Sequence, residues 1–300
     1  MRPERLRLDL QHAPPVQLEI APDHHSTQWY ALLQLHHLVC DGQSVSIFIS
    51  EVAAYLNRAD GLPEPIPYRN HVAQALAYAC KSDAELFFRE KLADIVETTA
   101  PYGFMNVHGT AATALEARRE LEPALATKLR REARRAGVSA ATLFHAAWGL
   151  VVSATTGRDD VVYGSVLLGR LQGSAGAQRI LGMFINTLPL RLRLRGRTAK
   201  QLVDDTQREL VGLLNHEQAS LALAQRCSGV AAAVPLFTSL LNYRHSMPDP
   251  AREWPGRLGI QSLGSHSWTN YPISVSVDDL GEGFAITAQK IGRASCRERV

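Results

Sequence analysis

The stretch His36-His37-Leu38-Val39-Cys40-Asp41-Gly42 decides how this chain of 300 residues is interpreted. It places two imidazoles, a carboxylate and a glycine close together, and the glycine permits a tight turn. The short apolar run at residues 29–35 is typical of a buried strand. From residue 44 to residue 56, apolar side chains recur three and four positions apart, which predicts an amphipathic helix. The motif therefore lies at a corner between a strand and a helix.

Several chemistries suit this corner. Histidine has an ordinary pKa close enough to 7 to take up and return a proton in one turnover. Because neighbouring side chains on extended backbone point to opposite sides, at most one of His36 and His37 faces a substrate. The alternatives are a metal site that also uses His24, His25 or Cys40, and a histidine pair that is only structural. The sequence has neither a helical HExxH nor a paired CxxC, so we expect no metal.

Charge and composition exclude some function classes. The formal net charge is +3, and it falls to +1 without the last ten residues, which hold three arginines and one glutamate. This balance offers no basic stripe for nucleic acid. No apolar run reaches the roughly 18 residues that span a bilayer. Outside the last ten residues the cysteines are Cys40, Cys80 and Cys227, an odd and widely spaced set with no secretory signal in front. We therefore expect a cytoplasmic protein without nucleic-acid or membrane partners.

The motif from His36 to Gly42 matches HHxxxDG, the signature of the condensation domains of nonribosomal peptide synthetases. Four further segments resemble that family's elements sGqdDvvvGtp..GR, iGxFvNTlplR, HQdvPfe and PLFqv.fny in order, at residues 156–170, 181–191, 215–218 and 234–243. The second match is almost residue for residue, and the third is diverged. The resemblance covers nearly all of residues 8–289.

The resemblance implies a chloramphenicol-acetyltransferase-like fold, an α/β (α+β two-layer) architecture of two lobes in a V with a channel between them. We expect residues 1–58 to be the C-terminal part of the first lobe and residues 59–110 to be a proline-rich linker with a bridging helix. Residues 111–290 then form the second lobe. The first lobe is expected to be incomplete, because the segment that precedes the motif in the family is missing. Residues 291–300 resemble a translated sequencing adapter, and we exclude them from the fold.

The predicted elements alternate, as in a layered fold. We expect helices at residues 72–92, 122–136, 140–154 and 198–214, and strands at residues 115–121, 161–168, 188–194, 236–243 and 273–277. The second of these helices carries five basic residues, for which a solvated face is favoured over a docking patch for an acidic carrier protein. The third is apolar nearly all round, so it is expected to be buried with His145 and Trp148 in the core. His216, at the end of the fourth, is expected to be structural.

The resemblance further implies an acyl/aminoacyl transferase that forms peptide bonds. The donor is an acyl or peptidyl thioester and the acceptor is the α-amino group of an aminoacyl thioester, each carried on the 4′-phosphopantetheine of a carrier protein. Both substrates arrive activated, so neither Ser44 nor Cys40 needs to form an acyl-enzyme, and no cofactor is bound directly. The implied partners are upstream and downstream peptidyl carrier domains and an adenylation domain in the same parent chain. The isolated fragment is expected to be inactive.

Five residues are expected to make up the site. His37 matches the second motif histidine and is expected to act as a base or to position the acceptor amine, whose ordinary pKa is about 7.7–8.0. His36 and Asp41 support the loop, and the N–H of Gly42 lies near a developing oxyanion. Asn186 is expected to line the channel. In the family the aspartate is held by an arginine from the missing N-terminal segment, so the partner of Asp41 is expected outside this chain.

Three alternatives remain open within the same fold. An epimerisation domain, or a dual epimerisation and condensation domain, would use the motif on an α-carbon proton. A non-catalytic recruitment module usually has a degraded HHxxxDG, and the motif here is intact. A free-standing acyltransferase has the shorter HxxxD core and no flanking carrier domains.

Overall fold

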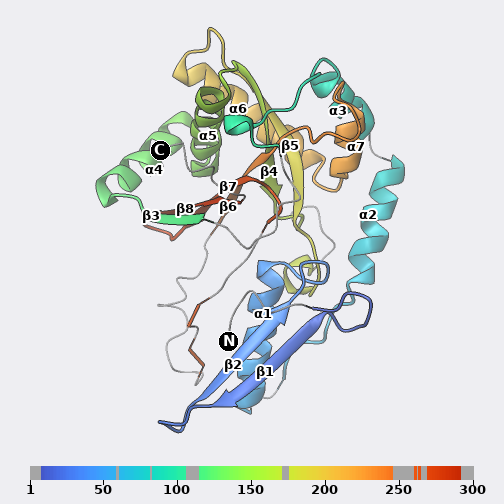
Figure 1. Ribbon diagram of the computed structural model, residues 1–300, viewed down its shortest axis with the longest axis vertical. Coiled ribbons are helices and arrows are strands. Elements are labelled where there is room, and N and C mark those ends of the chain that lie inside the picture. The colour runs from blue at the N-terminus through green and yellow to red at the C-terminus, as the bar shows by residue number, and fades with distance from the viewer. Residues whose placement is uncertain are drawn as a thin grey trace.

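The computed structural model describes residues 8–58, 61–81, 83–105, 115–170, 176–245, 260–261, 263–264 and 269–291. Among these residues the strands form one two-stranded and one six-stranded sheet. The small sheet lies at the lower end of the molecule with one helix, and the large sheet with most of the helices lies above it (Figure 1). Of the adapter-like residues 291–300, Ile291 is described, and residues 292–300, which include the cysteine at 296, lie outside the described residues.

The N-terminal unit is a hairpin followed by a helix. Strands β1 (Val16–Pro22) and β2 (Trp29–Leu35) pair antiparallel, and α1 (Gly42–Leu56) follows the histidine motif. Asp41 caps α1, because its side chain accepts a hydrogen bond from the backbone N of Ser44 at 2.8 Å. The predicted strand and helix around the motif are therefore confirmed, although the helix begins two residues earlier than the apolar pattern indicated. The expected burial of the strand was wrong, since no residue of β2 is buried and Trp29 and Tyr30 are 68% and 47% exposed. An apolar composition alone does not specify what packs against a strand.

The bridging region contains two helices where one was predicted. Helix α2 (Arg69–Lys81) runs up the side of the molecule, and α3 (Ala84–Leu92) lies against the second unit (Figure 1). Asp83 has non-helical backbone angles and precedes the first residue of α3. Phe88 and Leu92 of α3 are buried in the main core. The single helix predicted at 72–92 was wrong because apolar spacing alone does not reveal a break at which the chain changes its packing partner.

The large sheet has the strand order β3-β8-β7-β6-β4-β5. Its members in chain order are β3 (Leu115–Glu120), β4 (Asp160–Leu167), β5 (Asn186–Arg193), β6 (Ser239–Arg244), β7 (Ile273–Asp279) and β8 (Phe284–Lys290). Strand β6 runs parallel to β4 and β7, and the other pairs are antiparallel. Strand β8 was missed by the sequence prediction. Ile291 after it is buried and donates its backbone N–H to Pro272.

Helices cover one face of this sheet. They are α4 (Pro123–Ala136), α5 (Ala140–Thr156) and α6 (Ala199–Asn215), and the short α7 (Leu221–Arg226) lies beside α3. Helix α6 begins with a capping box formed by Thr198 and Gln201, which explains its start. No single helix in the described ranges is long and apolar enough to cross a membrane, and α4 and α5 meet that test only as a pair bent by 104°.

Helix α5 is buried on most sides but not on all. His145 is 3% exposed and Trp148 packs against the core, as predicted. Leu150 and Val151, however, are 52% and 46% exposed. The expected burial of this helix therefore holds for most of its circumference and is wrong for one side, because an apolar composition does not specify how many neighbours a helix has.

The buried imidazole of His145 predicts acid sensitivity. Burial lowers the pKa of His145 to about 3, whereas an unfolded histidine titrates near 6.5. Between these values the unfolded chain binds a proton that the folded chain refuses, so stability falls as the pH drops below about 6.5. We expect the free energy of unfolding to fall by about 1.4 kcal/mol per pH unit from this group alone.

Urea unfolding of the wild type and of His145→Gln between pH 7 and pH 4 measures this contribution. The variant should have a shallower dependence on pH, and His25→Gln, at an exposed position, should retain the wild-type slope. Equal slopes in the wild type and His145→Gln would contradict the prediction.

Candidate functional site

The histidine motif forms a tight loop whose two imidazoles have different bonds. The backbone N–H of Leu38 donates to Nδ1 of His36 at 3.1 Å, so this nitrogen is an acceptor and carries no proton. Nδ1 of His37 lies 3.1 Å from the carbonyl oxygen of Cys40. A carbonyl only accepts, so Nδ1 of His37 is the protonated nitrogen and the neutral ring keeps a lone pair on Nε2. The side chain of His37 is exposed, whereas that of His36 is half-buried.

Burial disfavours Cys40 as a nucleophile. Its side chain lies against the carbonyl of His36, with 3.7 Å between Sγ and the oxygen. Burial, reinforced by the charge of Asp41, raises the pKa of the Cys40 thiol. The thiolate that an acyl-enzyme requires is therefore disfavoured.

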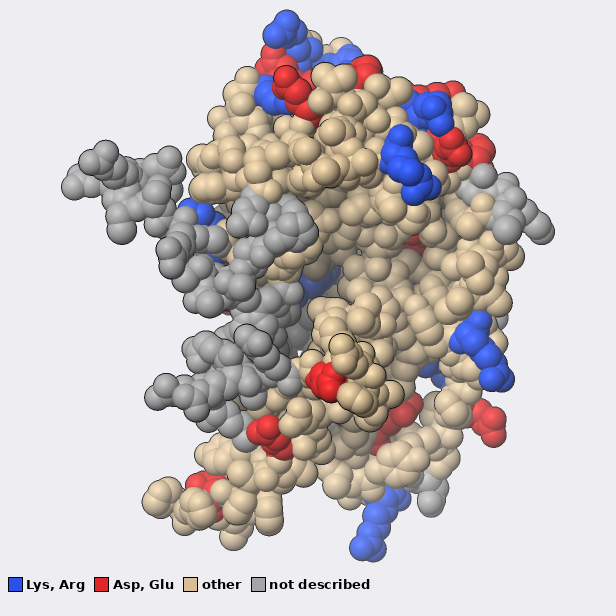
Figure 2. All heavy atoms as spheres, turned by 45° about the vertical axis from the view of Figure 1, so that its right-hand side comes forward, with Lys and Arg blue, Asp and Glu red and all other residues tan. Residues whose placement is uncertain are grey.

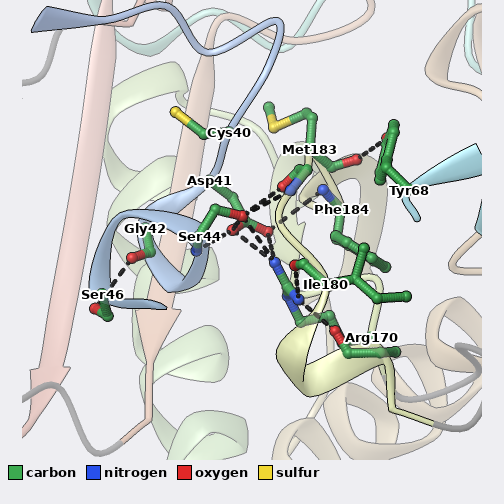
Figure 3. A network of polar contacts seen from close by, with 12 residues as sticks. Cys40, Asp41, Gly42, Ser44, Ser46, Tyr68, Arg170, Ile180, Met183 and Phe184 are labelled. Atoms are coloured by element: carbon green, nitrogen blue, oxygen red, sulfur yellow. Dashed lines mark hydrogen bonds and ion pairs between the residues drawn. The ribbon is translucent and has the colours of Figure 1, made fainter. Parts of the chain in front are cut away.

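Asp41 is the centre of a buried polar network (Figure 3). The residue as a whole is 1% exposed, and Nη2 of Arg170 lies 2.8 and 2.9 Å from its two carboxylate oxygens. The backbone N–H of Phe184 also donates to Oδ2 at 3.3 Å. Together with the hydrogen bond from the backbone N–H of Ser44, these contacts give both carboxylate oxygens hydrogen-bond partners. Asp41 therefore braces the histidine loop against the second unit.

The partner of Asp41 corrects the sequence prediction, which placed that arginine outside this chain. Arg170 lies 129 residues further along the same chain, shortly after the end of β4. A contact across this sequence distance has no local signal. The one clue was that Gly169-Arg170 ends the matched segment at 156–170, as the GR of the family element.

A short segment of the second unit, residues 177–184, lies across the N-terminal end of α1. We name it the seam segment. Its backbone is held by side chains from other parts of the chain (Figure 3). Ser44 Oγ donates to the carbonyl of Gly182 at 2.7 Å and accepts from its N–H at 3.0 Å. Tyr68 donates to the carbonyl of Met183 at 2.5 Å, and Nη1 of Arg170 donates to the carbonyl of Ile180 at 3.1 Å. The seam segment thus fixes the N-terminal unit to the second unit.

Aromatic rings close the seam from the side of α2. The guanidinium of Arg170 lies 3.9 Å from the ring centroid of Phe184, and the ring of His71 packs against the same phenyl in a tilted arrangement, with ring centroids 4.1 Å apart. Burial, with a smaller effect of Arg170, lowers the pKa of His71. Burial and Asp41 raise the pKa of Tyr68, and Arg170 opposes them. His71 is therefore neutral near pH 7. Sequence reasoning missed both His71 and Tyr68, since no spacing rule marks a linker residue as part of a seam.

A single methyl group at Gly169 is expected to disrupt this arrangement. Gly169 has φ +67°, and a Cβ there would overlap the backbone carbonyl of Phe184, which cannot move aside as a flexible side chain can. We expect Gly169→Ala to lower the free energy of unfolding by about 2–4 kcal/mol, combining left-handed strain with overpacking.

Gly157→Ala is the matched control for that variant. Gly157 also has a positive φ of +69°, but nothing lies within 4 Å of the place that its methyl group would occupy. It should therefore cost only the backbone strain, about 1–2 kcal/mol. Chemical denaturation of both variants tests the difference. Equal losses of unfolding free energy would mean that the close contact between Gly169 and the Phe184 carbonyl does not contribute to stability.

The remaining candidate residues are Gly42, Asn186 and His216. Gly42 is the first residue of α1 and has open space beside its Cα. Asn186 begins β5, and its Nδ2 donates to the carbonyls of Glu217 and Ala219 at 2.8 and 2.6 Å, so it holds the loop after α6. His216 lies at the end of α6 and stacks on Phe87 of α3 with ring centroids 4.1 Å apart, in keeping with a structural role.

The basic helix α4 is partly committed to internal contacts. Arg130 pairs with Asp279 at 2.5 Å and lies over the ring of Phe284 at 4.1 Å. Across the described part of the chain, no group of three or more histidine, cysteine, aspartate or glutamate residues is arranged to hold a metal ion.

Comparison with known proteins places these features in a family context. A sequence profile of the family described as "Condensation domain" matches residues 3–289. Malpibaldin synthetase and malpinin synthetase of Mortierella alpina are 42% and 41% identical to the chain over 288 residues. That alignment covers 96% of this chain but 5% and 4% of those proteins. Nonribosomal peptide synthetase 5 of Gibberella zeae is 28% identical over 263 residues, which are 86% of this chain and 2% of that protein.

Solved structures have the same fold. The condensation domain from Monacolin K polyketide synthase MokA matches with a TM-score of 0.67 and 16% identity, covering 89% of this chain and 65% of that one. The first condensation domain of the CDA synthetase matches with a TM-score of 0.65 and 22% identity, covering 88% and 59%. These matches confirm the mixed α/β, chloramphenicol-acetyltransferase-like fold.

Proposed function

Because this chain belongs to the condensation domain family, in the form found in nonribosomal peptide synthetases, we propose that it joins two carrier-bound substrates through an amide bond. The observation that carries the proposal is the intact motif at the seam between the two units. There the carboxylate of Asp41 is occupied by its ion pair with Arg170 and by hydrogen bonds within the fold. His37, by contrast, is exposed and has a lone pair on Nε2.

The proposed reaction needs one proton acceptor and no covalent enzyme intermediate. The α-amino group of the acceptor attacks the thioester carbonyl of the donor, a C–N bond forms, and the C–S bond breaks with loss of a thiolate. The amine loses one proton, which Nε2 of His37 accepts or directs to the departing sulfur. Holding the amine in its free form and aligned with the carbonyl supplies much of the rate enhancement.

The other motif residues support this geometry. His36 uses Nδ1 to accept from the N–H of Leu38, which fixes the turn. Asp41 connects the loop to Arg170. The N–H of Gly42, at the positive end of α1, is available to stabilise the oxyanion that develops on the thioester carbonyl. Asn186 is proposed to shape the channel by holding the loop after α6.

The chain is further proposed to act within a larger synthetase, since it spans only 5% and 4% of the two Mortierella relatives that it matches. Residues 1–58 would then contribute to the first lobe, residues 59–110 the linker, and residues 111–290 the second lobe. Its partners would be peptidyl carrier domains on either side and an adenylation domain, with both substrates on 4′-phosphopantetheine arms.

An assay in D2O separates this function from its alternatives. A synthetase containing the chain is incubated with one acylated and one aminoacylated carrier protein, and the products are analysed by mass spectrometry. Condensation predicts a new amide without deuterium at the donor α-carbon. Deuterium uptake without an amide would indicate an epimerisation domain, and both together would indicate a dual domain. The absence of both products would refute the proposed enzyme activity.

A further inference from the structure

His71 is a buried imidazole of the bridging region that has no part in the proposed reaction. It is the one buried residue among residues 69–79 of α2, with 6% exposure, and its Nδ1 has no hydrogen-bond partner among the described residues. A polar atom that is withdrawn from water without a partner costs free energy. The position of this ring therefore calls for an explanation beyond the packing of α2.

The ring of His71 joins the bridging region to the seam segment through aromatic contacts. Its centroid lies 4.1 Å from that of Phe184 and 5.5 Å from that of Tyr68, and the ring of Tyr68 meets Phe184 edge-on at 5.6 Å. Phe184 belongs to a small apolar cluster that is separate from the main core. The surface is hollowed between the upper and lower parts of the molecule (Figure 2). These contacts therefore matter for how the two parts are held together.

Phe184 connects His71 to the charged pair of the seam. The guanidinium of Arg170 lies over the same phenyl ring, 3.9 Å from its centroid. The backbone N–H of Phe184 donates to Oδ2 of Asp41 at 3.3 Å, and Asp41 caps α1 four residues after His37. A shift of Phe184 would thus disturb both the carboxylate and the cation that pairs with it. The loop that carries His37 is anchored at this carboxylate.

The neutral form of His71 is the one that fits this environment. A protonated ring carries an N–H on both nitrogens, so its Nδ1–H would be a buried donor without an acceptor. Burial, and to a smaller extent the like charge of Arg170, lowers the pKa of His71. The other charged or titratable groups on the elements that pack around the ring are Arg69 of α2, Tyr68 before it, Asp41, which Arg170 binds, and Arg179, which donates to the carbonyl of Glu64.

We propose that the neutral ring of His71 positions the histidine motif by holding Phe184 in contact with Arg170. Protonation of the ring places a second cation beside the guanidinium and loosens the seam segment. A histidine that has left the seam titrates near pH 6.5, so the open seam takes up a proton more readily than the closed one. The closed seam is therefore fully favoured above about pH 6.5 and is lost progressively below it. This inference extends the proposed function, because the loop so positioned carries the proposed base His37.

Hydrogen exchange of the seam segment tests this role without requiring catalysis. Peptides that cover residues 177–184 of the 300-residue chain are followed by mass spectrometry at pH 7.0 and pH 5.5, and each rate is divided by the intrinsic rate at that pH. In the wild type, protection should fall by about 3- to 8-fold on acidification, with the upper figure set by an ordinary histidine. His71→Phe keeps an aromatic ring against Phe184 and does not titrate, so its loss should stay below about 2-fold.

His145→Gln is the matched control, since it removes the other buried histidine of the described residues, on α5. It should lose seam protection in acid as the wild type does. Peptides from β4 report global opening, and their protection should fall less than that of the seam segment. Equal acid losses in the wild type and His71→Phe, or a wild type whose seam protection does not change, would overturn the inference.

The pH dependence of catalysis tests the consequence for the motif. Amide formation by a synthetase containing the chain is measured at pH 7.0 and pH 5.5. Both enzymes lose the base His37 in acid but only the wild type loses the seam, so His71→Phe should retain about 3- to 8-fold more of its kcat. The difference should lie in kcat rather than in KM, and an equal fall of kcat in both enzymes would contradict the positioning role. His71-dependent seam protection without any amide product would preserve the seam role and refute only the proposed function.

Discussion

Replacing Arg170 by alanine is expected to destabilise the protein by about 3–5 kcal/mol, the cost of leaving a buried carboxylate without its counter-charge. The side chains of Arg170 and Asp41 are only 3% and 2% exposed. The same guanidinium also holds the carbonyls of Ala177 and Ile180 and lies over the ring of Phe184. One substitution therefore removes the ion pair, two seam bonds and a ring contact together.

Urea unfolding with an exposed pair as control measures this loss. Arg195 contacts Asp159 at 2.8 Å, but its side chain is 88% exposed. Arg195→Ala should cost at most about 1 kcal/mol, because solvent screens an exposed ion pair. A loss below about 1 kcal/mol for Arg170→Ala would mean that the seam does not depend on this pair.

The partner contacts also indicate how Arg170→Ala should be rescued. Replacing Asp41 by asparagine in the Arg170→Ala background removes the unpaired charge and keeps a side-chain acceptor for the N–H of Ser44. The double variant is therefore expected to be more stable than Arg170→Ala alone. Such non-additivity is typical of two groups in direct contact.

Local features of the fold could be predicted from the sequence. The corner around the histidine motif depends on a short apolar strand, a capping aspartate and an amphipathic helix, all within about 30 residues. Helix α6 was predicted at 198–214 and is observed at Ala199–Asn215, because its cap and its apolar spacing are likewise local in sequence. Strand β8 had a comparable signal, since Phe284, Ile286 and Ala288 alternate with other residues, but the prediction ended at residue 277.

Contacts between distant segments could not be predicted from residue spacing. The seam joins Asp41 to Arg170 and Tyr68 to Met183, pairs that lie 129 and 115 residues apart. Their side chains are ordinary when considered one at a time, and only the three-dimensional fold brings them together. The prediction that the arginine partner of Asp41 lies outside this chain was therefore wrong. The family and the fold, which were predicted from several motifs in the same order, are confirmed.

His37→Ala is expected to lower the rate of amide formation by about 10²- to 10⁴-fold, the usual contribution of a positioned acid or base. The side chain of His37 is exposed, and its bond to Cys40 lies within one loop, so the fold should survive the substitution. His36→Ala removes the acceptor for the N–H of Leu38 but leaves Nε2 of His37 in place. Its effect on the rate should therefore be smaller.

The most direct measurement is the single-turnover rate of amide formation between two preloaded carrier proteins, compared among the wild-type synthetase, His37→Ala and His36→Ala. Intact-protein mass spectrometry follows both the new amide and the loading of each carrier. We predict that His37→Ala leaves loading unchanged and nearly abolishes the product, with His36→Ala between this variant and the wild type. A wild-type rate of product formation in His37→Ala would contradict the assignment of this chain's chemistry to the histidine motif.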